Sequence, residues 1–243
     1  MFPMTYGPPT KPGGRRHNGR MTAPHEGAIP KTFHALEAKE SLGELAQSGE
    51  ADIEHGRRWF EWRASSEMLY RIHPPLVAPI APGHRDLGDY LDDVPEVLGA
   101  HLMVLMQAGA SSLGWFEGGE CRSTKSFRRY VVRGKGRAQP THLKSKGKSR
   151  YGSRLRLQNA EALLEETVER MQDWWDEFGP AERVLVSCPV RLWASVLEME
   201  PAPPFVAADT PVTKIPKDLP KPTSELLDRT YRFCCYGRVE LAP

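Results

Sequence analysis

The stretch Arg122–Arg156 reads RSTKSFRRYVVRGKGRAQPTHLKSKGKSRYGSRLR, and the rest of the chain is organised around it. It holds thirteen Lys and Arg residues and no Asp or Glu, whereas the whole chain has a formal net charge of only +2. The remaining residues therefore carry a net charge of −11. Charge segregated in this way predicts a surface for a polyanion such as nucleic acid. A solvated, disordered loop is the alternative reading of the same charges.

The order within this stretch predicts a strand followed by a loop. Phe127, Tyr130 and Val131 give its first part the alternation of a β-strand that starts near Cys121. The sequence GKGRAQP at 134–140 breaks the strand. The polar run that continues to Ser153 cannot bury enough apolar surface to order itself. We therefore expect a strand that delivers a long, basic, mobile loop.

The chain of 243 residues is 40% apolar, which suits one domain with appendages. No run approaches the roughly 18 apolar residues of a membrane helix, and the N-terminus lacks the apolar segment of a secretory signal. The four cysteines form no CxxC pair and no zinc pattern, so we expect a reducing, cytoplasmic setting. No nucleotide-binding glycine motif, HExxH or GxSxG is complete, and no metal or cofactor is predicted.

Hydrophobic periodicity predicts a mixed α/β layer. In the first half of the chain the expected elements are a helix ending near Gly49, paired strands at 59–62 and 68–70, an acidic helix or turn at 86–93, and a three-stranded meander at 101–107, 113–117 and from 121. A helix from Asn159 to Phe178 and a strand at 183–188, parallel to an earlier strand, are expected next. Helices at 190–199 and 223–231, separated by a proline-rich connection at 201–222, and a strand at 233–241 complete the expected elements. Asn159 is expected as an N-cap and Gly179-Pro180 as the end of its helix. The acidic face of that helix, with Glu165, Glu166 and Glu169, is expected to point outward.

Taken with its flanks, the basic stretch resembles the catalytic domain of Vms-like release factors, the VLRF branch, which is related to the Gly-Gly-Gln-bearing central domain of eukaryotic and archaeal class I release factors. The matching motifs are KSFRRYVVR at 125–133, the GxxQ pattern GRAQ at 136–139, the run from Ser149 to Asn159, KIP at 214–216 and KPTSEL at 221–226. The resemblance implies a release-factor central-domain-like fold: a mixed, mostly antiparallel twisted sheet with helices packed on it and a long basic loop.

Composition and periodicity for the first 56 residues, and the resemblance for the rest, predict a domain organisation. Residues 1–31 are expected as a disordered basic tail, 32–56 as a short helix and linker, 57–235 as the catalytic domain with its core at 100–232, and 236–243 as a C-terminal strand or tail. The protein would act as a cytoplasmic, monomeric ribosome quality control factor. Its partners would be the ribosomal RNA of an obstructed large subunit and the peptidyl-tRNA, whose nascent chain it would release by hydrolysis.

The implied site residues are Gln139, Gly136 and Ala138 for catalysis. Those implied for RNA binding are Lys125, Arg128, Arg129, Arg133, Lys135, Arg137, Lys144, Lys146, Lys148, Arg150 and Arg154. For Arg129 and Arg133, bracing of the strand by local salt bridges is an equal alternative to RNA contact. Tyr130 is expected in the core, and Cys234-Cys235 as an incidental pair on a strand. Two further functions stay open: a nuclease that cuts the tRNA 3′ end with the same loop, and a non-catalytic ribosome-binding adaptor.

Overall fold

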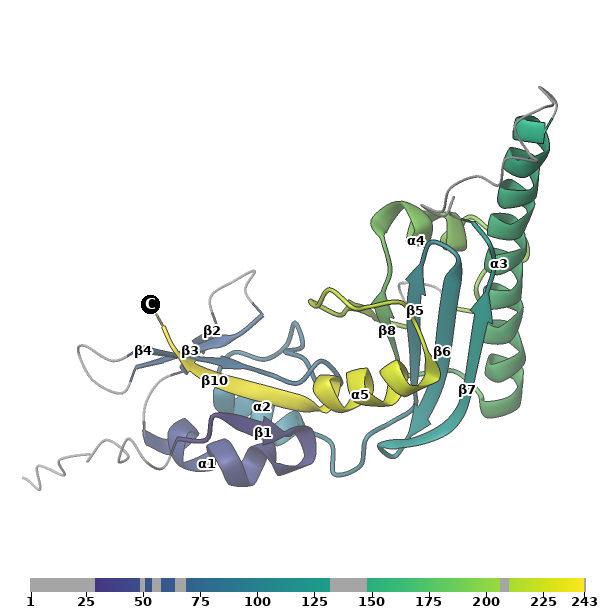
Figure 1. The fold of residues 1–243 in the computed structure, drawn as a ribbon. Helices are drawn as coiled ribbons and strands as arrows, with labels where there is room; N and C mark the ends of the chain where they lie inside the picture. The colour runs from purple at the N-terminus through teal and green to yellow at the C-terminus, as the bar shows by residue number, and fades with distance from the viewer. Residues whose placement is uncertain are drawn as a thin grey trace, which may run out of the picture.

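A computed structural model describes residues 29–48, 51–53, 58–63, 69–131, 148–205 and 210–242. Over these residues the chain is α/β, with two five-stranded sheets in place of the single sheet expected from the sequence. Figure 1 shows the two sheets side by side, with helices packed against each. One sheet is mixed and the other is entirely antiparallel, and they are called the mixed sheet and the antiparallel sheet below.

The mixed sheet has the strand order β7-β6-β5-β8-β9. The predicted meander is confirmed, because β5 (His101–Gln107), β6 (Ala110–Glu117) and β7 (Glu120–Arg128) pair antiparallel in succession. The predicted parallel strand is also confirmed, since β8 (Arg183–Ser187) runs parallel to β5. A further parallel strand, β9 (Val212–Lys214), lies within the connection that was expected to have no strand.

Helices cover both faces of the mixed sheet. Alternation along β5 sends Leu102 and Val104 to one face and Met103 and Leu105 to the other. The first pair packs with α3 (Lys148–Phe178) and α4 (Val190–Leu197), and the second pair packs with α5 (Ser224–Cys235). The predicted helices at 190–199 and 223–231 are thereby confirmed, and the Thr223 side chain caps α5 by accepting the N–H of Leu226.

The antiparallel sheet draws strands from both ends of the described chain. Its order is β1 (Thr32–His34), β10 (Tyr236–Leu241), β4 (Leu69–His73), β3 (Phe60–Arg63) and β2 (Ala51–Ile53). The predicted strand pair around Trp62 and Tyr70 is confirmed as β3 and β4. A short 3-10 turn at Ala35–Glu37 leads into α1 (Ala38–Ser48), and α1 and α2 (Leu87–Asp93) pack on this sheet around Leu42, Phe60 and Tyr90. The sheet thus combines residues from three of the segments expected above, whose boundaries stay a prediction.

The last helix and the last strand are continuous. The α5 helix ends at Cys235 and β10 begins at Tyr236, so one uninterrupted element crosses from the mixed sheet to the antiparallel sheet (Figure 1). The expectation that Cys234-Cys235 is a strand pair was wrong, because both cysteines lie buried in the last turn of α5. Their side chains pack in the core between α5 and the mixed sheet, which extended the helix beyond its predicted end.

The predicted start of α3 was also wrong. The helix begins at Lys148 rather than after Asn159, so Asn159 lies within the helix and does not cap it. The apolar positions of its second half are confirmed as core, since Leu163, Val168, Met171 and Trp174 are all buried against the mixed sheet. The helix ends as expected at Gly179, which has a φ of 86°.

His101 gives the fold a testable dependence on pH. It is buried at the start of β5, with Nδ1 2.9 Å from the hydroxyl of Tyr231. Burial, followed by the charge of Arg183, lowers the pKa of His101 from 6.5 to about 4. Below pH 6.5 the unfolded chain takes up a proton that the folded chain refuses, so the free energy of unfolding should fall between pH 6.5 and 4.

We expect this loss to be about 2 kcal/mol between pH 7 and pH 5. Urea unfolding of the wild type and of His101→Gln at both pH values measures it, because the variant keeps a polar side chain without the titration. The difference in unfolding free energy between the two pH values should be smaller in the variant. The same pH dependence in both chains would contradict the assignment.

Candidate nucleic-acid interface

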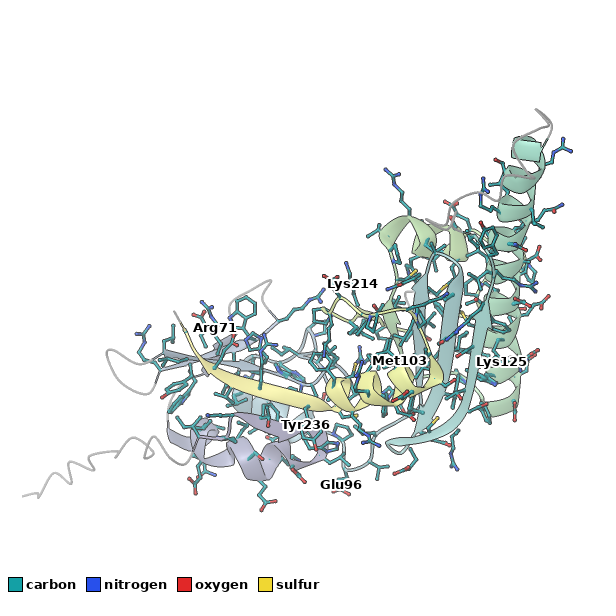
Figure 2. The ribbon with its side chains drawn as sticks, viewed as in Figure 1. Arg71, Glu96, Met103, Lys125, Lys214 and Tyr236 are labelled. Atoms are coloured by element: carbon teal, nitrogen blue, oxygen red, sulfur yellow. The ribbon has the colours of Figure 1, made fainter. Side chains whose placement is uncertain are left out.

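We call residues 129–147, which follow β7 and precede α3, the basic segment. The strand that leads into it, β7, is one of the two outer strands of the mixed sheet. Along β7 the side chains of Lys125 and Arg128 are exposed, and they lie on opposite faces because the strand alternates. Lys125 lies on the α3 side, where its Nζ stands 5.8 Å from the centre of the Phe127 ring. Figure 2 labels Lys125 beside β7 and Lys214 at the end of β9, on the two outer strands of this sheet.

Immediately after β7 the backbone is held by the turn between β5 and β6. The N–H of Arg129 donates to the carbonyl of Gly109 at 3.0 Å. Gly109 has a φ of 81°, and a Cβ at this position would lie 2.6 Å from the carbonyl oxygen of Arg129. Glycine is therefore required here both by the backbone conformation and by the close approach of the neighbouring chain.

A side-chain ion pair fixes the same point to α3. The Arg129 guanidinium donates from Nε and Nη2 to the two carboxylate oxygens of Glu166, at 3.1 and 2.5 Å. This two-point contact raises the pKa of Arg129 above its usual value. Glu166 was expected to face outward, away from nucleic acid, but it faces the end of the strand. The geometry matches the bracing alternative for Arg129, and its contact with RNA stays a prediction.

One residue further on, a helix side chain holds the main chain. The Asn159 side-chain amide donates to the carbonyl of Tyr130 at 2.8 Å. The Tyr130 side chain is 57% exposed, so the prediction that it belongs to the core was wrong. Tyr130 follows the end of β7, which is an outer strand of the sheet and has no buried side chain. Glu166 and Asn159 thus brace both residues that follow β7.

The first turns of α3 extend past the sheet. Figure 1 shows the upper end of α3 standing clear of the strands. Eleven residues separate Lys148 from Asn159, so with a rise of 1.5 Å per residue about 16 Å of helix lies beyond the braced strand end. The described side chains of this part, from Gly152 to Gln158, are not buried. We call residues 148–158 the projecting part of α3.

The projecting part of α3 is basic, whereas the part of α3 that packs on the sheet is acidic. The projecting part contains Lys148, Arg150, Arg154 and Arg156 and no acidic residue. The packed remainder, from 159 to 178, has seven acidic residues and one basic residue. Cations near a helix N-terminus oppose the helix dipole, so their presence there does not serve the stability of the helix. This arrangement favours a role in binding an external anion.

The structure places six of the predicted site residues on or next to two elements. Lys125, Arg128 and Arg129 lie on or just after β7, and Lys148, Arg150 and Arg154 lie on the projecting part of α3. The remaining predicted residues fall outside the described residues: Gln139, Gly136, Ala138, Arg133, Lys135, Arg137, Lys144 and Lys146. Sequence reasoning placed Gly109 in a turn but missed its contact with Arg129, and it missed the bracing roles of Asn159 and Glu166. A glycine in a short turn between two strands was the one available signal for Gly109.

Asn159→Asp tests the bracing directly. Aspartate has the shape of asparagine but cannot donate, so its carboxylate would face the Tyr130 carbonyl without a hydrogen bond. We expect faster amide hydrogen exchange at residues 129–131 and a loss of about 1 kcal/mol in unfolding free energy. Gln158→Ala, an exposed neighbour on α3, serves as the control and should change neither quantity. Unchanged exchange in Asn159→Asp would mean that the bond does not hold the strand end.

The described residues offer no clear alternative chemistry. Within them, no group of three or more His, Cys, Asp or Glu residues is placed to hold a metal ion. All four cysteines are free, and burial raises the pKa of the Cys188 thiol to about 12, which keeps it protonated. No helix in this part of the chain combines the length and hydrophobicity needed to cross a membrane.

A comparison with protein-family models agrees with the family suggested by the motifs. Residues 101–241 match the family model described as the Bacteroidetes VLRF1 release factor. A search of the curated proteins found no match. Among solved structures, one titled "Vms1 mitochondrial localization core" is similar, with a TM-score of 0.45 and 9% identity over 86% of this chain and 82% of that chain.

The matched region contains the whole mixed sheet, its three helices and β10, and it covers more than half of the chain. The protein is therefore a translation factor of the release-factor class. It belongs to the Bacteroidetes VLRF1 release factor family.

Proposed function

We propose that this protein releases nascent chains from obstructed large ribosomal subunits by hydrolysing the ester bond of peptidyl-tRNA. The observation that carries the proposal is the family match over residues 101–241, which includes the GxxQ pattern at 136–139. Release factors as a class act on peptidyl-tRNA at the ribosome. The partners of this protein would be large-subunit ribosomal RNA and peptidyl-tRNA.

The braced strand end and the projecting part of α3 support the proposal. The basic segment starts at a point fixed by Gly109, Glu166 and Asn159 and ends on a helix that extends about 16 Å past the sheet. Such a pair of supports suits a segment that must reach into a deep site within RNA. The Lys and Arg residues of both supports would neutralise phosphates, so ribosome binding should weaken steeply with salt.

In this proposal Gln139 positions the attacking group. An amide is too weak a base to remove a proton, so its contribution would be to orient the attacking water by hydrogen bonding. Gly136 would let the loop backbone approach RNA closely. The ribosomal RNA would supply much of the remaining catalytic environment, since burial raises the pKa of each of the four cysteine thiols and so disfavours the thiolate nucleophile.

The test uses purified large subunits that carry a peptidyl-tRNA labelled on both the peptide and the tRNA. After addition of the protein, a denaturing gel separates the products. Free peptide beside full-length tRNA is the expected result. A tRNA shortened at its 3′ end would show that the protein is a nuclease and does not hydrolyse the ester. If the protein co-sediments with the subunit but forms no product, it acts as a binding adaptor.

A further inference from the structure

A pocket opens at the edge of the mixed sheet where the parallel strands end. Its volume is about 460 Å³, within the range of small-molecule sites. It is lined by the last residues of β5, β8 and β9 and by the segments that follow β8 and β9. The lining side chains used below are Met106, Ser187, Val190, Lys214, Ile215 and Lys217.

The chain topology explains why a pocket forms here. After β8 the chain turns to the face covered by α3 and α4, and after β9 it leads to α5 on the opposite face. The two connections diverge and leave a crevice beyond the carboxyl ends of β8 and β9. In open α/β sheets this divergence of connections is the place where ligands bind.

The chemistry of the lining suits a phosphorylated ligand with an apolar body. Val190, which is 74% exposed, supplies apolar surface beside the buried Met106 and Ile215, and Ser187 supplies a hydroxyl. Lys214 and Lys217 carry positive charge, and Asp218 is the one carboxylate in the lining, so the lining has a net positive charge. The Lys217 ammonium lies 4.7 Å from the centre of the Phe233 ring. We therefore take the exposed Lys214 as the cation that would bind an anionic ligand.

The backbone around the pocket is held by its own hydrogen bonds. The Gln107 amide donates to the carbonyl of Leu219 at 2.6 Å, and the N–H of Ile215 donates to the carbonyl of Val186 at 2.8 Å. These bonds fix the segment carrying the lysines against the ends of β5 and β8. The Cys188 thiol in the lining stays protonated because burial raises its pKa to about 12, so the pocket is suited to binding rather than to thiol chemistry.

The pocket opens at the same edge of the sheet from which the basic segment departs. Arg128 at the end of β7 pairs with Ala110, and Ala110 pairs with Gln107 at the end of β5. Two strand spacings of about 4.8 Å therefore put the pocket roughly 10 Å from the end of β7. A single RNA strand bound along this edge could reach both places.

We propose that this pocket binds a nucleotide, either free or as one unpaired residue of an RNA strand. The phosphate meets Lys214 and the base packs on Val190. The RNA form rests on the function proposed above, because it places the same strand against the basic segment. A free nucleotide needs only the pocket.

The test compares two charge reversals on one segment. Lys214→Glu changes a lining residue, and Lys221→Glu makes the same change at an exposed lysine that does not line the pocket. The probes are AMP, inorganic phosphate and a fluorescein-labelled hexaribonucleotide of mixed sequence. Calorimetry measures AMP binding, anisotropy measures RNA binding, and amide NMR shifts at Met106, Ser187 and Val190 locate the ligand. Thermal unfolding checks that each variant folds.

Lys214→Glu should weaken AMP binding by about tenfold or more, and Lys221→Glu by about twofold or less. Shifts at the pocket caused by AMP identify a free-nucleotide site, and shifts caused only by the hexaribonucleotide identify an RNA subsite; both support the proposal. If the two variants weaken AMP binding equally, the binding depends on general charge attraction and the proposed site is overturned. Absent shifts, or equal shifts with inorganic phosphate and AMP, would also overturn it.

These readouts are separate from peptide release. A protein that releases peptide but shows no ligand at the pocket overturns this inference alone. A protein that binds a nucleotide at the pocket but releases no peptide from peptidyl-tRNA overturns the proposed function alone. Gln139→Ala should bind AMP as the wild type does.

Discussion

Replacing Gln139 with alanine is expected to lower the rate of peptide release on large ribosomal subunits by about a hundredfold or more. If the amide orients the attacking group, its removal takes away hydrogen bonds that matter most in the transition state. Affinity for the subunit should barely change, because the surrounding Lys and Arg residues supply the attraction to phosphate. Single-turnover release kinetics, with co-sedimentation as the binding measurement, check both statements.

Two further variants sharpen this test. Gln158→Ala removes an exposed glutamine from the projecting part of α3 and should release peptide at the wild-type rate. Gln139→Glu keeps the shape of the side chain but replaces the amide donor with a carboxylate, and it should be nearly as slow as Gln139→Ala. Full activity in Gln139→Ala would remove Gln139 from the mechanism while leaving the family membership intact.

Trp115→Ala is expected to lower the free energy of unfolding by about 3 to 5 kcal/mol. Trp115 lies on β6, is fully buried, and contacts two aromatic residues of α3. Its ring centre is 6.0 Å from that of Trp175 in an edge-on arrangement and 5.4 Å from that of Phe178. Such a loss is a large share of the 5 to 15 kcal/mol of a typical domain. Urea unfolding followed by circular dichroism measures it.

Trp193→Ala is the matched control for this substitution. Trp193 lies on α4 and is only partly buried, with its ring stacked 6.3 Å from that of Phe205. Trp193→Ala should therefore lower the free energy of unfolding by clearly less than Trp115→Ala does. Trp115→Phe retains an aromatic ring and should recover part of the loss. A wild-type unfolding midpoint in Trp115→Ala would show that α3 does not depend on this contact.

The sequence was most informative where packing imposes a period. Leu163, Val168, Met171 and Trp174 recur at helical spacing, and the structure buries all four. The projecting part of α3 has no apolar period, so its helix could not be read from the pattern. Extending a helix that is already nucleated is far easier than starting one, and the packed half supplies the nucleus.

Long-range partners left no local signal. His73 and Glu240 are 167 positions apart, yet they meet across β4 and β10 at 2.8 Å. The antiparallel sheet depends on such pairings and could not be inferred from neighbouring residues. The same limit applies to Glu166, whose partner Arg129 lies 37 positions earlier. Periodicity shows which face of a helix a residue occupies, but it does not show what that face meets.

The position of β10 has a consequence for how the protein is made. β10 lies between β1 and β4 in the antiparallel sheet, although it is synthesised more than 160 residues after them. Domains often fold in order as the chain emerges during translation. Here β1 and β4 cannot be joined in one sheet until β10, which ends at Leu241, has been synthesised. A ribosome that stalled within the last strand would hold a chain whose first sheet was still open, with β1 and β4 lacking the strand that joins them.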